Sequence, residues 1–135
     1  MRKLLCFKIL ISVALTILAF SCNKLPKNGI AKINFELYGC FGSEQSELTI
    51  YKSGGVQKAR LDTKGIGEVE AIVDKEGEKA FEIFLRSIKA ADRTTGCTTQ
   101  QHCSVYTQSE TLEKKNIDCS WQGFNELKTA LFKQD

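Results

Sequence analysis

The fold is decided by residues 66–92, IGEVEAIVDKEGEKAFEIFLRSIKAAD, where the spacing of apolar residues changes. Up to residue 73 apolar and polar residues alternate, which predicts a strand over 66–73 with one buried face. After Asp74, a residue type suited to capping a helix, the apolar spacing becomes helical and predicts a helix over 75–92. The inward residues are Val69, Ala71 and Val73 in the strand and Phe81, Phe84, Leu85 and Ile88 in the helix.

Three further strands are predicted before this stretch, over 30–38, 47–52 and 56–61. The first two alternate apolar and polar side chains, as half-buried strands do, and the third follows a tight turn. Glycine-containing turns separate them, including Gly54-Gly55, and glycine readily adopts the positive φ that tight hairpin turns need. The four strands together predict an antiparallel meander.

After the helix, residues 94–102 are polar and are interpreted as a loop that ends at Gln101 and His102. Strands over 103–108 and 114–119 are expected to form a β-hairpin. A C-terminal helix is expected over 122–133, with Ser120 as its cap and Trp121 filling the core at its entrance. The order of four strands, helix, hairpin and helix predicts a single α+β domain over residues 30–135, with the helices packed on one face of the sheet.

Residues 1–21 differ from the rest of the chain and are typical of a secretory signal peptide. Three basic residues lie near the start, and an apolar run follows over 9–20. This run is short for a membrane-spanning helix, which needs about 20 apolar residues. We therefore expect export, with an uncleaved anchor helix as the alternative.

The segment ends in Leu18-Ala19-Phe20-Ser21-Cys22, which resembles the lipobox of small bacterial lipoproteins. Two later stretches belong to the same overall pattern, GCFG at 39–42 and CSWQGF at 119–124. The resemblance implies cleavage before Cys22, a diacylglycerol on its thiol, and residues 22–29 as lipidated cysteine and tether. Asn23 in second place favours the outer membrane. The resemblance implies no activity, and ordinary secretion with Cys22 in a disulfide is the alternative.

The charge of +3 belongs to the signal segment. Without its three basic residues, the mature chain has 16 basic and 16 acidic residues. A neutral domain lacks the basic surface of a nucleic-acid-binding protein. It also gives no electrostatic attraction to anionic lipid, so the acyl chains on Cys22 would provide the contact with the membrane.

Four of the six cysteines remain when Cys6 leaves with the signal and Cys22 is acylated. An even number in an exported chain predicts two disulfides. Two sets of pairs are favoured: a short loop closed by Cys97–Cys103 with Cys40–Cys119, or a hairpin closed by Cys103–Cys119 with Cys40–Cys97. The third set, Cys40–Cys103 with Cys97–Cys119, stays open. The spacing around Cys97 and Cys103 is not that of a zinc site, and no metal is expected.

Residues that could carry catalysis are few. His102 is the only histidine, and it is interpreted as a surface residue. The glutamates Glu68 and Glu70 are expected on the outward face of a strand, without the apolar surroundings that raise a carboxyl pKa. No nucleotide or phosphate-binding motif is present, so the sequence favours a protein that is not an enzyme and needs no cofactor.

The favoured hypothesis is a lipid-anchored binding domain of the cell envelope, with an unidentified protein or envelope partner. A second hypothesis is an inhibitor or immunity protein, because some bacterial lysozyme inhibitors insert a disulfide-closed, histidine-bearing loop into their target. The faintly similar loop here is Thr98, Thr99, Gln100, Gln101 and His102, between Cys97 and Cys103. A small envelope hydrolase and a structural subunit are the third and fourth hypotheses.

Overall fold

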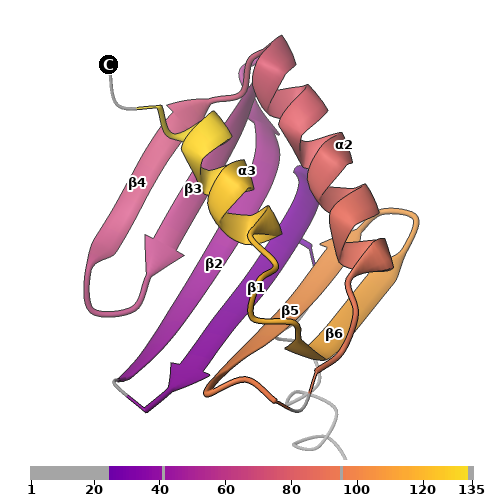
Figure 1. Ribbon diagram of the computed structural model, residues 1–135. Helices are drawn as coiled ribbons and strands as arrows, with labels where there is room; N and C mark the ends of the chain where they lie inside the picture. Colours follow the sequence, from indigo (N-terminus) through magenta and orange to yellow (C-terminus); the bar gives the residue numbers. More distant parts are fainter. Residues whose placement is uncertain (1–24, 41, 95, 134–135) are drawn as a thin grey trace, which may run out of the picture.

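The computed structural model describes residues 25–40, 42–94 and 96–133. The chain forms six strands and two helices within these ranges (Figure 1). The elements are β1 (Gly29–Gly39), β2 (Gly42–Ser53), β3 (Val56–Thr63), β4 (Gly67–Ile72), α2 (Lys75–Ala90), β5 (Thr99–Thr107), β6 (Thr111–Ile117) and α3 (Gly123–Leu131).

The strands form one antiparallel sheet in the order β4-β3-β2-β1-β5-β6. Strands β1 to β4 are the expected meander, and β5 and β6 are the expected hairpin. Helix α2 carries the chain from the β4 edge back to β5, which pairs with β1 in the middle of the sheet. Both helices cover the same face (Figure 1), so the predicted α+β fold is confirmed.

The main error in the predicted boundaries lies before Cys103. The segment expected to be a polar loop over 94–102 contains the first half of β5, which begins at Thr99. Its backbone pairs with β1 from Gly39↔Thr99 to Ala31↔Thr107. This half of the strand was not predicted because its residues are polar. They are compatible with a strand because one face of β5 is solvated and because β1 and β6 pair with its backbone on both sides.

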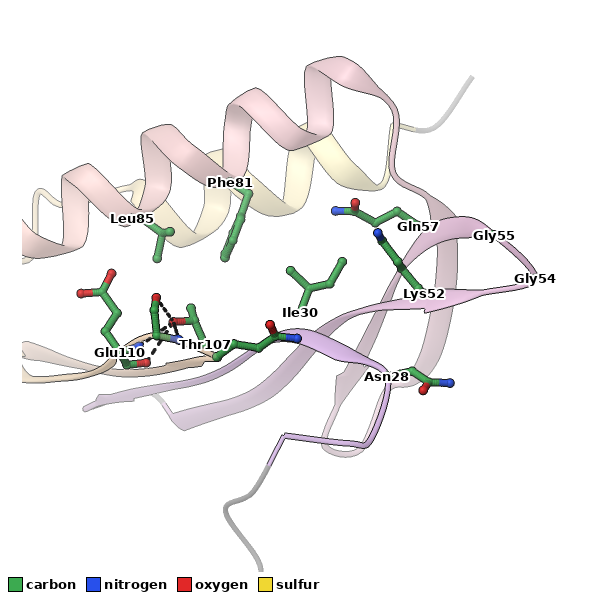
Figure 2. A pocket seen from close by; sticks show the side chains of 12 residues that line it. Asn28, Ile30, Lys52, Gly54, Gly55, Gln57, Phe81, Leu85, Thr107 and Glu110 are labelled. Carbon is green, nitrogen blue, oxygen red and sulfur yellow. Dashed lines mark hydrogen bonds between the residues drawn. The ribbon is translucent and has the colours of Figure 1, made fainter.

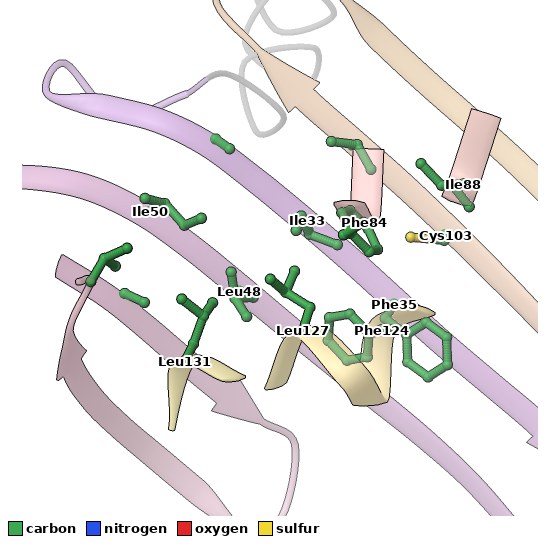
Figure 3. Close-up of a cluster of buried hydrophobic side chains, with 14 of the residues drawn as sticks. Ile33, Phe35, Leu48, Ile50, Phe84, Ile88, Cys103, Phe124, Leu127 and Leu131 are labelled. Carbon is green, nitrogen blue, oxygen red and sulfur yellow. The ribbon is translucent and has the colours of Figure 1, made fainter. Parts of the chain in front are cut away.

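The core lies between the sheet and the two helices (Figure 3). Phe35 of β1 stacks on Phe124 of α3, with ring centroids 4.4 Å apart. Leu48 and Ile50 of β2 are fully buried in the same cluster. The other members of this buried cluster include Ile33, Phe84, Ile88, Cys103, Val105, Ile117, Leu127 and Leu131.

Strand β4 is less protected than its pattern predicted. Val69, expected to point into the core, is 51% exposed, whereas Val73 just after the strand is 7% exposed. Figure 1 shows β4 as the outermost strand, beyond α3. The correct face was therefore identified, but the helices do not extend far enough to cover Val69.

The helix ends confirm one predicted cap and correct another. Asp74 caps α2, and its carboxylate accepts a hydrogen bond of 2.7 Å from the Gly77 N–H. Ser120 does not cap α3; the N-cap is Gln122, and the Ser120 hydroxyl instead donates to Asp118. Trp121 packs against the core, as expected, and its indole N–H donates to Ser87 of α2 at 3.3 Å.

Candidate functional site

A groove of about 760 Å³ lies between helix α2 and one end of the sheet (Figure 2). Phe81 and Leu85 point into it from the helix, and Ile30 points toward them from the sheet. All three side chains are half-buried and packed against the core. The groove therefore has an apolar floor that the chain itself leaves partly open.

Two turns and the start of β1 form the walls of this groove. On one side is the β2–β3 turn at Gly54 and Gly55, whose φ angles of +59° and +79° suit glycine. On the other side is the β5–β6 turn, where the Thr107 hydroxyl accepts the Glu110 N–H at 3.0 Å. The Gln108 amide joins this turn to β1 by donating to the Gly29 carbonyl at 3.4 Å. The walls are thus held by hydrogen bonds within the described chain.

The charges around the groove do not balance. Its acidic residue, Glu110, forms an ion pair with Lys89 at 2.7 Å. Its basic residue, Lys52, is exposed and has no ion-pair partner among the described residues. Of the charged side chains that line the groove, the one left for a ligand is an ammonium group.

The sequence did not reveal this groove, although it contained one relevant signal. Phe81 and Leu85 were assigned to the buried face of the helix together with Phe84 and Ile88. In the structure Phe84 and Ile88 are 2% and 0% exposed, whereas Phe81 and Leu85 are half-buried. The apolar stripe of the helix is wider than the sheet beneath it can cover, and sequence spacing alone cannot measure that difference.

The expected binding loop at 98–102 is not a closed loop. Thr99, Gln100, Gln101 and His102 lie in β5, and only Thr98 precedes the strand. Gln101 points inward and is 7% exposed, and its amide donates to the backbone carbonyls of residues 118, 119 and 121. The segment therefore does not present its side chains together to a partner.

Both favoured cysteine pairings are wrong. The disulfide joins Cys97 to Cys119, with their Cα atoms 5.9 Å apart. Cys103 is buried and reduced, and Cys40 is exposed and reduced, so the second expected disulfide is not formed either. Burial raises the pKa of the Cys103 thiol to about 12. The Cys97–Cys119 disulfide indicates an oxidising, extracytoplasmic compartment.

His102 lies on the opposite face of the sheet from the groove. Its Nε2 is 3.2 Å from the Asn116 side-chain oxygen, and its ring meets the edge of Tyr38 with centroids 5.6 Å apart. Asn116 has a φ of +55° at an irregularity in the β5–β6 pairing. Because the helix-covered and open faces are separated by the sheet, His102 cannot contribute to the groove.

The outward carboxylates on the open face form ion pairs. Glu70 accepts hydrogen bonds from Lys58 at 2.8 Å and from Tyr51. The Lys58 ammonium and then the Tyr51 hydroxyl lower the pKa of Glu70 below its ordinary value. A general acid working near neutral pH needs the opposite shift. The expectation that Glu68 and Glu70 point away from the core is confirmed, since they pair with Arg60 and Lys58.

The described ranges contain neither a metal-binding cluster nor a membrane-spanning helix. In residues 25–40, 42–94 and 96–133, no cluster of three or more His, Cys, Asp or Glu side chains could hold a metal ion. No helix in the same ranges is long and apolar enough to span a bilayer. The predicted signal peptide over 1–21 and the lipidation site Cys22 lie outside the described residues.

Comparison of the chain with protein-family models, with curated proteins and with solved structures finds no match.

Proposed function

We propose that this chain is an exported, lipid-anchored protein of the bacterial cell envelope whose domain binds a ligand and catalyses no reaction. The N-terminal 22 residues support the anchor, because a basic start, an apolar run and Ser21-Cys22 are the features of a lipoprotein signal. The Cys97–Cys119 disulfide supports export. The outer membrane is the proposed destination.

The groove beside α2 is the observation that carries the binding role. Ligand sites are concave, largely apolar and furnished with a few polar groups, and their volumes are about 300–1,000 Å³. The groove of about 760 Å³ has this composition, with Ile30, Phe81 and Leu85 as floor and Lys52 and Gln57 at its edge. The inhibitor hypothesis loses its main support, because the loop closed by Cys97–Cys103 does not exist.

Mass spectrometry of the protein from its native envelope tests the anchor. The expected mature chain begins at Cys22, carries acyl chains on that residue, and contains the Cys97–Cys119 bond. Incorporation of a labelled fatty acid is the second measurement: Cys22→Ser is expected to abolish it. Cys40→Ser is the matched control, because Cys40 is also an exposed thiol but is not expected to carry lipid, and this variant should still incorporate the label.

An intact N-terminus from residue 1, or an unmodified Cys22 at the start of a soluble protein, would contradict the lipid anchor. The binding role is tested separately by placing a photoreactive phenylalanine analogue at position 81 or 83 in envelope-localised protein. Phe81 lines the groove, whereas Ile83 lies on the same helix, is 45% exposed and does not line it. An adduct at 81 but not at 83 is expected, and equal labelling at both positions would contradict a groove-specific ligand.

A further inference from the structure

The ligand class of the groove can be inferred from the position of its groups. In Figure 2, Lys52 and Gln57 extend from the β2–β3 end, and Phe81 and Leu85 lie farther along the helix. Ile30 lies between these two pairs in the view. The groove thus has a polar, cationic end followed by an apolar floor. This order fits a molecule with an anionic head and an apolar tail.

The cationic end is chemically available. Lys52 has no ion-pair partner among the described residues, whereas Glu110 is already neutralised by Lys89. A bound anion would therefore meet an unpaired ammonium group and no free carboxylate from the lining. A ligand with a cationic head would gain no such partner, and a neutral head would leave the Lys52 charge uncompensated.

The apolar floor favours a ligand with a single hydrocarbon chain. Phe81, Leu85 and Ile30 are half-buried in the absence of a ligand, so an apolar chain lying over them would remove their remaining surface from water. The volume of about 760 Å³ lies within the range of sites for drug-sized ligands. We propose that this groove binds a single-chain amphiphile with a carboxylate head, such as a fatty acid, with the head at Lys52 and the tail over Phe81 and Leu85.

The source of this ligand rests on the proposed function. The Asn28 carbonyl accepts the Lys52 N–H at 3.1 Å, so the start of the domain lies beside the cationic end of the groove. Leu25 follows Cys22 by three residues, a span of at most about 11 Å. An acylated Cys22 would therefore hold this end of the groove close to the bilayer, where such amphiphiles concentrate.

Binding is tested on the mature chain from residue 22 with Cys22→Ser, exported behind an ordinary cleavable signal and purified without detergent, so that the result depends neither on acyl chains nor on the apolar segment over 9–20. The probe is a dansyl-labelled undecanoic acid, whose fluorescence rises in an apolar site, and competitors of equal chain length displace it. Decanoate is expected to compete about threefold better than decanol, and decyltrimethylammonium least well, because an exposed ion pair is worth up to about 1 kcal/mol, which corresponds to at most about fivefold.

Two pairs of variants locate the site. Lys52→Gln is expected to weaken decanoate about threefold and to abolish its advantage over decanol. Lys64→Gln, an exposed lysine in the β3–β4 turn at the other end of the strands, should change nothing. Phe81→Gln is expected to weaken every competitor about tenfold, whereas Ile83→Gln should not.

Equal competition by the three head groups, equal loss with Lys64→Gln, or absence of displaceable binding would overturn the proposal. If Phe81→Gln fails to fold, the surface substitution Lys52→Gln still decides the result. The two proposals fail independently. Acylated Cys22 without amphiphile binding would overturn only the ligand, and amphiphile binding with an unmodified Cys22 would overturn only the anchor.

Discussion

Breaking the Cys97–Cys119 disulfide should remove a definable part of the stability of the domain. The bond joins residues 22 positions apart, just before β5 and just after β6. In the chain-entropy model, closing a loop of this length in the unfolded chain is worth about 3 kcal/mol at 25 °C. We therefore expect Cys97→Ala and Cys119→Ala each to lower the free energy of unfolding by about 3 kcal/mol.

Urea denaturation of the mature chain from residue 22, with Cys22→Ser as background, measures this loss. The double variant should lose no more than either single variant, because all three lack the same bond. A reducing agent should bring the parent protein down to the level of the variants and leave the variants unchanged. Cys40→Ser is the control, because its thiol is exposed and reduced. This variant should have the stability of the parent protein, both without and with the reductant.

Two results would refute this reasoning. If the oxidised and reduced proteins unfold at the same urea concentration, the bond either does not form or does not constrain the unfolded chain. If non-reduced peptide mapping finds Cys40 or Cys103 in a disulfide, the assignment of the bond is wrong. A loss of stability in Cys103→Ala would not indicate a disulfide at Cys103. This side chain is 1% exposed, so its substitution also removes core packing.

Three further predictions concern the core, the thiols and the open face. Phe124→Ala should lower the free energy of unfolding by about 3–5 kcal/mol in urea denaturation, because Phe124 is 1% exposed and stacks on Phe35 at 4.4 Å; a loss below about 1 kcal/mol would contradict the packing described. Iodoacetamide at pH 8 should alkylate Cys40 in the folded protein and Cys103 only after denaturation, since burial raises the Cys103 pKa to about 12; mass spectrometry reads the outcome, and labelling of native Cys103 would show that the core opens. The pKa of Glu70 is lowered in the folded state by Lys58, so its contribution to stability is present above the ordinary value of 4.5 and is lost as the pH falls through the folded pKa; Glu70→Gln should therefore reduce the loss of stability on acidification from pH 5 to pH 3, and an unchanged acid limb in pH-dependent unfolding would exclude this ion pair as a contributor.

On the open face of the sheet, the sequence predicted the direction of the side chains but not their partners. Alternation placed Glu68 and Glu70 outward, and the structure confirms this, because the side-chain period of two is a local property of any strand. The sequence contained no indication that Lys58 and Tyr51 would contact Glu70, since that contact depends on the register between β3 and β4 and on the neighbouring β2. The same limit applies to His102, whose neighbours Asn116 and Tyr38 come from β6 and β1.

The candidate site was the least predictable part of the domain. Each residue that forms its floor was correctly recognised as apolar, and Phe81 and Leu85 were placed on the correct face of the helix. The groove forms where α2 crosses the end of the sheet. The β2–β3 turn lies on one side of the groove and the β5–β6 turn on the other. The groove depends on how far the helix and the sheet cover each other, and this coverage is set only when the two elements pack.

The sequence alone determined the order and type of the elements, the Asp74 cap and the buried faces of β1, β2 and β4, because these depend on neighbours within a few residues. The tertiary structure alone decided that β5 extends back to Thr99 beside β1, that Cys97 pairs with Cys119 while Cys103 is buried, and that Phe81 borders an open groove. Strand pairing, cysteine pairing and the coverage of a helix all bring together residues far apart in the chain. Local spacing restricts such contacts, but the packing of the whole domain selects among them.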